Sequence, residues 1–257
     1  MDTTLQSNER SFWGGRLPIF YGWLILPVAS LALFTSGPGQ TYTISVFVDP
    51  IIEDMGWSRT LVSSLYTAGS LSAALVMVLV GHLLDRFGAR IMLMGVAVCF
   101  GFGVLFMSTV NHPIELYAGF AALRIFGQGS LTLIPTALIS LWFIRFRARA
   151  TAISSIGMTG SQALLPPLVH MLIAEFGWRN AWVTLAFMVW GLLLIPVATV
   201  IRRSPESVGL HPDGTSDPSA LLGEFAEPRI NHEVDWSLRE SFHTRAFWLL
   251  LFSGSSL

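Results

Sequence analysis

A single arginine stands in an otherwise uncharged segment of the sequence, ALRIFGQGSLTLIP, residues 122–135. Charged side chains inside long apolar runs are costly and commonly mark the path of an ion or a substrate. No carboxylate in the neighbouring apolar runs offers Arg124 an obvious permanent partner. We therefore expect Arg124 to face a water-filled cavity and to attract an anionic group or respond to a proton-coupled step. The alternative, for a membrane-spanning segment, is that its side chain extends to the outer surface or binds a backbone carbonyl.

Two polar clusters beside glycines could act together with this arginine. The first is GPGQTY, residues 37–42, and the second is GQG, residues 127–129. We expect the side chains of Gln40, Tyr42 and Gln128 to line the same cavity. The residues expected to weaken or break their helices are Gly37, Pro38, Gly39, Gly127 and Gly129. Helix breaks in corresponding positions of a repeat indicate a transporter's binding site. The alternative is that these glycines only let helices pack closely.

A charge cluster, GHLLDRFGAR (residues 81–90), separates two long apolar runs. A carboxylate at a helix end can pair with arginines or with a facing helix N-terminus, and a modest contact of this kind favours one of two conformations. Asp85, Arg86 and Arg90 could form such a contact, while Gly81 and Gly88 would allow a close helix crossing and a tight turn. The alternative is that these charges only fix the topology and solvate a short loop.

Six long apolar runs position these residues. The chain is 53% hydrophobic and only 12% charged, about half the charge of a soluble domain. The runs long enough to span a bilayer are residues 21–48, 61–84, 91–110, 116–143, 150–173 and 181–201. They lack the alternation of a membrane β-barrel, so we expect an all-α membrane protein. Within the fifth run, Pro166 and Pro167 are expected to bend or end the regular helix.

The arginines predict the orientation of these spans. Arg59 and Arg179 flank the spans on one side. Nine arginines flank them on the other side: Arg10, Arg16, Arg86, Arg90, Arg145, Arg147, Arg149, Arg202 and Arg203. By the positive-inside rule the N-terminus is cytoplasmic, and we expect a multi-pass protein of the plasma (inner) membrane. Trp178, in the outer turn FGWRN, is expected to anchor at the membrane interface.

The spans also suggest an internal repeat. Gly37 lies 16 residues from the cytoplasmic end of the first run (37 − 21), and Gly127 lies 16 residues from that of the fourth (143 − 127). Equal depths in the first and fourth of six spans fit a three-plus-three inverted repeat. We expect residues 1–20 to form a cytoplasmic tail, 202–246 a cytoplasmic linker and 247–257 the start of a seventh helix. Because that last apolar run stops halfway, the chain looks truncated.

Several kinds of chemistry have no support in the sequence. A net charge of −1 provides no basic face for nucleic acid. There is no H-E-x-x-H, no G-x-S-x-G, no G-x-x-x-x-G-K and no pair of intramembrane aspartates. The spacing of His211, His232 and His243 matches no metal motif. We therefore expect no enzyme activity, no metal and no cofactor, which leaves a carrier driven by ion or substrate gradients.

The motifs resemble a known family. GHLLDRFGAR is similar to the signature between the second and third helices of the major facilitator superfamily, although Ala89 stands where a basic residue is usual. LRIFGQG resembles the fourth-helix signature, with Gly127 one residue earlier than usual. GQTYTISVFVDPI, FRARATAISSIGMTGSQALLPPL and PESVGLHPDG resemble the branch that contains monocarboxylate transporters and oxalate/formate-type antiporters. The resemblance covers nearly the whole chain.

This resemblance implies a twelve-helix carrier of two six-helix halves with alternating access, of which this chain is the N-terminal half. It also implies that Asp85, with Arg86 and Arg90, helps to latch the two halves at the cytoplasmic face. We expect a secondary transporter of small organic anions, monocarboxylate-like, coupled to protons or to exchange. Its partners would be the lipid bilayer, the anion and the missing C-terminal half. The alternatives are a non-transporting receptor or sensor on the same fold and an inactive fragment.

Overall fold

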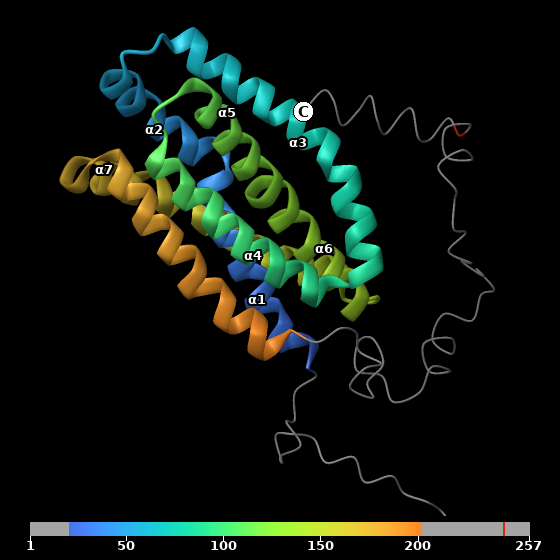
Figure 1. The fold of residues 1–257 in the computed structure, drawn as a ribbon. Helices are drawn as coiled ribbons and strands as arrows, with labels where there is room; N and C mark the ends of the chain where they lie inside the picture. The colour runs from blue at the N-terminus through green and yellow to red at the C-terminus, as the bar shows by residue number, and fades with distance from the viewer. Residues whose placement is uncertain (1–20, 202–243, 245–257) are drawn as a thin grey trace, which may run out of the picture. The chain divides into compact units, whose positions relative to one another are not determined.

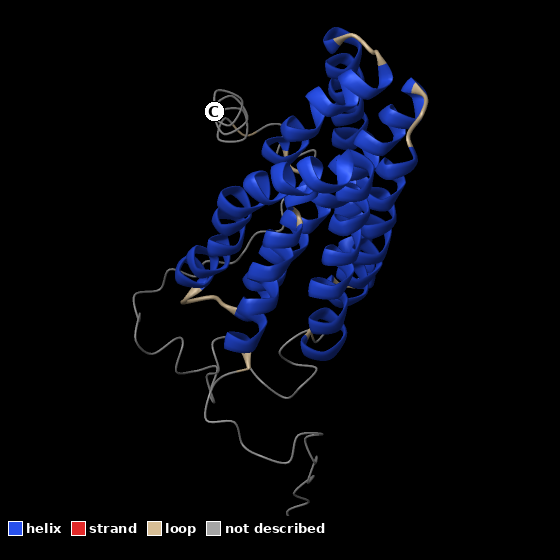
Figure 2. Ribbon diagram, turned by 90° about the vertical axis from the view of Figure 1, so that its left-hand side faces the viewer, coloured by secondary structure: helices blue, strands red, loops and turns tan. Residues whose placement is uncertain are grey.

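The computed structural model describes residues 21–201 and residue 244. The predicted tail, linker and seventh helix lie outside these residues. Residues 21–201 form a bundle of helices joined by short loops at its two ends, and this part of the chain contains no strand (Figure 2). In chain order the elements are α1 (Gly22–Thr35), η1 (Gly37–Gly39), α2 (Thr41–Met55), α3 (Arg59–Phe87), α4 (Ala89–Phe106), η2 (Met107–Thr109), α5 (Pro113–Ala122), η3 (Leu123–Ser130), α6 (Leu131–Trp142) and α7 (Arg147–Val200).

These elements make six membrane spans. Five stretches among the described residues are long and apolar enough to cross a bilayer: Gly22–Met55, α3, Ala89–Thr109, Pro113–Trp142 and α7. At 1.5 Å per residue the 54 residues of α7 would extend about 81 Å, far more than the roughly 30 Å of a hydrocarbon core. Gly177 divides α7 into two helices, because its backbone is non-helical with φ 79° and ψ 161°. The predicted all-α membrane fold is thus confirmed.

The helices extend past the predicted apolar runs at several ends, and the first and fourth spans are two examples. The first span was expected to end at residue 48, but α2 continues to Met55, where Gly56 ends the helix with a left-handed φ of 67°. The fourth span was expected to begin at residue 116, but α5 begins at Pro113. A capping box stabilises this earlier start, since the backbone N–H of His112 donates to Glu115 Oε2 over 3.1 Å.

The prolines of the fifth span do not end its helix. Pro166 and Pro167 lie inside α7, and the helix continues for about ten residues beyond them to Gly177. Proline has a fixed φ near −65° that suits a helix, and in a membrane neighbouring groups can satisfy the carbonyls that lose a donor. Of the two predicted alternatives, a bend or an end, the structure rules out the end, because the helix continues to Gly177.

Two similar turns relate the halves of the bundle. Gly88, between α3 and α4, has φ 78° and ψ 162°, nearly the same as Gly177. Two residues after each glycine, an arginine side chain donates a hydrogen bond to a backbone carbonyl near the C-terminal end of a neighbouring span. Arg90 Nη2 donates to the carbonyl of Ala198 over 3.2 Å, and Arg179 Nη1 donates to the carbonyl of Val110 over 2.9 Å. The third and sixth spans are thereby joined at both ends, as an inverted repeat requires.

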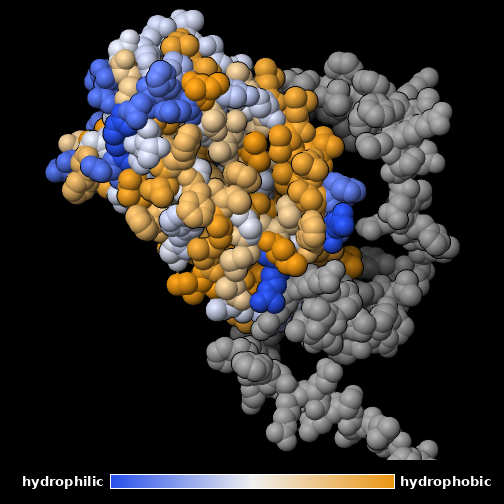
Figure 3. Space-filling model, viewed as in Figure 1, coloured by the Kyte–Doolittle hydropathy of each residue, from blue (hydrophilic) through white to orange (hydrophobic). Residues whose placement is uncertain are grey.

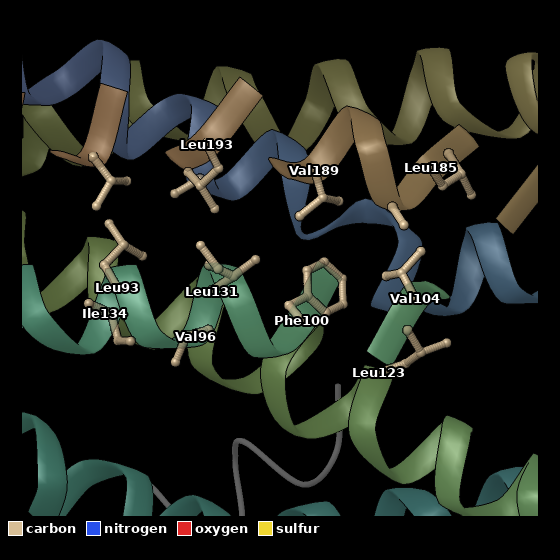
Figure 4. Packing of buried hydrophobic residues seen from close by; sticks show 14 of the residues in the cluster. Leu93, Val96, Phe100, Val104, Leu123, Leu131, Ile134, Leu185, Val189 and Leu193 are labelled. Carbon is tan, nitrogen blue, oxygen red and sulfur yellow. The ribbon is translucent and has the colours of Figure 1, made fainter. Parts of the chain in front are cut away.

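One part of the core, shown in Figure 4, lies where α4 meets α6, η3 and the second half of α7, and the same buried cluster extends to α1 and α2. Four buried side chains of α4 are spaced three to four residues apart along the helix. Figure 4 shows them facing residues of the other elements: Leu93, Val96, Phe100 and Val104 lie opposite Leu123, Leu131, Ile134, Leu185, Val189 and Leu193. In lipid, helices associate through close packing of this kind, because the surrounding tails are as apolar as the side chains.

The outside of the bundle is apolar as well. On the face in Figure 3 hydrophobic residues dominate the middle of the bundle, and hydrophilic residues gather toward its ends. On α3 the side chains of Leu71, Leu75 and Val78 are 66%, 80% and 77% exposed. Such a surface is stable against lipid and not against water, so the chain is an integral, multi-pass membrane protein.

One predicted interface anchor is buried instead. Trp178 is only 6% exposed, and its indole N–H donates to Asp54 Oδ2 over 3.1 Å. Arg179 lies against the same indole ring, with its guanidinium carbon 4.3 Å from the ring centroid. The expectation of a membrane-interface anchor is therefore wrong for Trp178, which joins the first span to the sixth.

Candidate functional site

The two glycine-rich interruptions meet in the middle of the bundle. Residues 37–39 form a short 3₁₀ turn, η1, between α1 and α2. Residues 123–130 form a π-helical segment, η3, between α5 and α6. A Cβ added to Gly39 would come within 2.8 Å of the Gly127 Cα and 3.1 Å of the Gln128 backbone nitrogen. The backbones of the first and fourth spans thus approach as closely as glycine permits, and π-helical segments are frequent at functional sites.

Arg124 lies in the first turn of η3. It is eleven residues beyond Pro113 (124 − 113), about 16 Å along the span and near its middle. Its Nη1 donates to Thr41 Oγ1 over 3.3 Å, at the first residue of α2. Its guanidinium carbon lies 5.1 Å from the Tyr66 ring centroid, within the range of a cation–π contact. Among the described residues Arg124 forms no ion pair.

Tyr66 of α3 is a functional candidate that the sequence did not reveal. Its hydroxyl and that of Thr41 are 2.8 Å apart, and its ring packs edge-on against Phe120 at 5.5 Å. Arg124, Thr41 and Tyr66 therefore form one cluster, called the arginine cluster below. A hint was present in the sequence, because the second apolar run carries several hydroxyl side chains, but nothing in one sequence says which of them faces the fourth span.

The other three predicted pathway residues do not join the arginine cluster. Gln40 is 7% exposed and its Nε2 donates to Ser36 Oγ over 3.2 Å, within its own span. Tyr42 points to the fifth span, where its hydroxyl donates to Ser161 Oγ over 2.9 Å. Gln128 Oε1 is buried and has no hydrogen-bond partner among the described residues. The sequence led us to expect these side chains in one cavity with Arg124, but the structure directs Gln40 and Tyr42 to other partners.

A cavity opens beside the arginine cluster. Its volume is about 170 Å³, and it lies between α2 and α3, with Phe120 of α5 as part of its wall. Thr41 and Tyr66 belong both to its lining and to the arginine cluster. The remaining lining residues are Ile44, Ser45, Val48, Val62, Ser63, Thr67 and Phe120. A cationic side chain next to a cavity suits an anionic ligand.

The charge cluster of residues 81–90 lies at the turn between α3 and α4. Asp85 and Arg86 are exposed, and Asp85 forms no hydrogen bond or ion pair within the described part of the chain. Gly88 makes the turn with its positive φ, so the glycine is required there. Gly81 has no neighbour within 4 Å of an added Cβ, so the helix crossing expected at Gly81 does not occur among the described residues.

Interrupted helices that meet at mid-bundle, beside a half-buried arginine that has no ion-pair partner among the described residues, are typical of membrane transport proteins. Residues 19–257 match the model of a family described as Major Facilitator Superfamily. The chain belongs to this superfamily, as its motifs indicate. The family is one of transporters and not of enzymes, and its members act on small molecules in the membrane.

Individual relatives agree with this membership. The chain is 31% identical over 150 residues to "MFS transporter asaE" of Aspergillus flavus, covering 58% of this chain and 33% of that protein. It is 27% identical over 222 residues to "Probable L-galactonate transporter" of Escherichia coli, covering 82% and 46%. It is 29% identical over 215 residues to human "Monocarboxylate transporter 11", covering 79% and 42%. The chain thus spans about a third to a half of the length of these relatives.

Proposed function

We propose that the full-length protein is a secondary active transporter of small organic anions, monocarboxylates above all, that works by alternating access with proton coupling or exchange. The observation that carries this proposal is the arginine cluster. Arg124 is half-buried at mid-span, has hydroxyl and aromatic neighbours, and lacks a carboxylate partner in the described residues. A substrate carboxylate would supply the missing charge.

The energetics favour such a ligand. A guanidinium near the middle of a bilayer costs several kcal/mol unless it is hydrated or paired. A hydroxyl and an aromatic face stabilise the cation only in part, because neither carries a full negative charge. A bound carboxylate would add a charge-assisted, bidentate interaction that arginine geometry suits. Relatives named for monocarboxylate and L-galactonate transport are consistent with a carboxylate substrate.

The two helix interruptions would let the site change shape. Gly39 and Gly127 hold the first and fourth spans in backbone contact beside Arg124, so a change at the arginine cluster can move both spans. We assign substrate-pathway roles to Arg124, Gln40, Tyr42 and Gln128, and Gly37, Pro38 and Gly129 help to form the breaks. These roles and the coupling ion belong to the proposal.

The exposed turn of residues 81–90 would act in the same cycle. Asp85 near the end of α3 has no partner among the described residues, so it is available to a partner in the rest of the full-length protein, with Arg86 and Arg90 in the same network. Such a contact would favour one of two conformations. We place this turn and the N-terminus on the cytoplasmic side of the plasma membrane, in keeping with the arginine distribution.

Uptake by the full-length protein in liposomes tests the proposal. Labelled pyruvate or lactate should enter faster than in protein-free liposomes and should respond to a pH gradient or to internal carboxylate. Arg124→Ala should lower kcat/KM by about 30-fold or more, because truncating one partner of a buried charge pair costs at least about 2 kcal/mol. Arg59→Gln is the matched control, since Arg59 pairs with Asp49 at the exposed end of the bundle. Full transport by Arg124→Ala would remove Arg124 from the substrate site.

A further inference from the structure

The cavity beside the arginine cluster has mostly apolar walls. Ile44 and Val48 come from α2, Val62 from α3 and Phe120 from α5. Ile44, Val62 and Phe120 are buried in the bundle. This cavity adjoins the hydroxyl groups and the ring of the arginine cluster at one end, and the rest of its wall combines these four apolar side chains with three hydroxyl side chains. A ligand that contacts the arginine cluster and also fills the cavity would need an anionic end and an apolar body.

The hydroxyl groups of the lining are largely engaged elsewhere. Ser45 Oγ donates to the Tyr42 carbonyl over 3.0 Å, and Thr67 Oγ1 donates to the Ser63 carbonyl over 2.9 Å. The Thr41 hydroxyl is bonded to that of Tyr66. Of the described side chains that line the cavity, the Ser63 hydroxyl alone lacks such a partner. The cavity thus offers few free hydrogen-bond donors to the oxygen atoms of a polyhydroxylated ligand.

We propose that this cavity is the subsite for the apolar part of the transported acid, and that it selects aliphatic monocarboxylates over sugar acids. The inference rests on the proposed function and narrows its substrate class. The carboxylate binds Arg124, and the alkyl chain lies against Ile44, Val48 and Val62. Hydroxyls buried there without partners would lose their hydrogen bonds to water, and this penalty excludes polyhydroxylated chains.

The size of the cavity suits a short chain. Its volume is about 170 Å³, which leaves room for several water-sized groups, so a short alkyl chain would fit there. Hexanoate and gluconate form a suitable pair of probes, because both have six carbons and one carboxylate and differ in hydroxylation.

Binding to the purified full-length protein in detergent tests the subsite, with calorimetric Kd values for hexanoate, gluconate and pyruvate. Hexanoate should bind at least about tenfold more tightly than gluconate. Val48→Thr and Val62→Thr keep the side-chain volume but place a hydroxyl in the cavity wall. Each substitution should weaken the binding of hexanoate, relative to the binding of pyruvate, by roughly tenfold. Val48 is only half-buried, so Val48→Thr keeps the test valid if Val62→Thr does not fold.

Val96→Thr is the matched control, because Val96 is buried in the α4 core and does not line the cavity. The ratio of its Kd for hexanoate to its Kd for pyruvate should equal that of the unchanged protein. Equal affinities for hexanoate and gluconate would overturn the subsite while leaving an anion transporter in place. The subsite would also be overturned if the hexanoate-to-pyruvate affinity ratios of Val48→Thr and Val62→Thr equalled the ratio of Val96→Thr. Absence of binding by all three carboxylates would overturn the proposed function itself.

Discussion

Gly39→Ala should separate the two interrupted spans at their point of contact. The added Cβ would come within 2.5 Å of the Leu123 carbonyl oxygen, 2.8 Å of the Gly127 Cα and 3.1 Å of the Gln128 nitrogen. Ordinary contacts of a Cβ lie at 3.4–4 Å. All three atoms belong to the backbone, so no side-chain rotation relieves the overlap and η1 must move away from η3. Overpacking of this kind costs typically about 1–3 kcal/mol.

Thermal unfolding of the full-length protein in detergent measures this cost. At about 2–4 °C per kcal/mol, the apparent Tm of Gly39→Ala should fall by about 2–12 °C at a fixed scan rate. Gly95→Ala in α4 is the matched control, because no atom lies within 4 Å of its added Cβ. Alanine there should stabilise the helix by roughly 0.5–1 kcal/mol. An unchanged Tm for Gly39→Ala would refute the direct backbone contact between η1 and η3.

Two further predictions concern the turns and their arginines. Arg179→Ala removes hydrogen bonds to the carbonyls of Ser108 and Val110 and to Asn111 Oδ1, whereas Arg90→Ala removes one, to Ala198. Arg179→Ala should therefore lower the apparent Tm more than Arg90→Ala, and the reverse order would contradict the assigned contacts. Gly88→Ala and Gly177→Ala force a side chain into a positive-φ conformation that costs about 1–3 kcal/mol. Both should lower the Tm, in contrast to Gly95→Ala, and a Tm as high as that of Gly95→Ala would count against these turn geometries.

The spans were predictable because their signal is local. A bilayer requires about 20 consecutive apolar residues, and this condition can be checked without knowing any tertiary contact. The ends were less certain, since α2 extends past residue 48 and α5 starts at Pro113. The start of α5 depends on the His112–Glu115 capping box, whose histidine is not a usual N-cap residue, and the length of α2 depends on where Gly56 ends the helix.

The site was predictable only in part. Arg124 stood out because its charge interrupts an apolar run, and the glycines beside it indicated a break. Tyr66 lies 58 residues earlier (124 − 66), in another span, and no periodicity connects the two residues. Gln40 and Tyr42 are near the break in sequence, yet Gln40, the extended residue between η1 and α2, bonds to Ser36, and Tyr42, in the first turn of α2, points to Ser161. Direction around a helix decides such contacts, and it follows from packing against neighbours.

The lipid surroundings of this protein, the number of its spans, its family and the unusual charge at Arg124 could all be inferred from the sequence, because each depends on residue types along one segment. The tertiary structure alone decided which segments meet. It brought η1 against η3, set Tyr66 beneath the guanidinium, buried Trp178 and left an apolar cavity next to the arginine cluster. Those features arise from contacts between distant spans, and such contacts depend on the joint packing of all six spans.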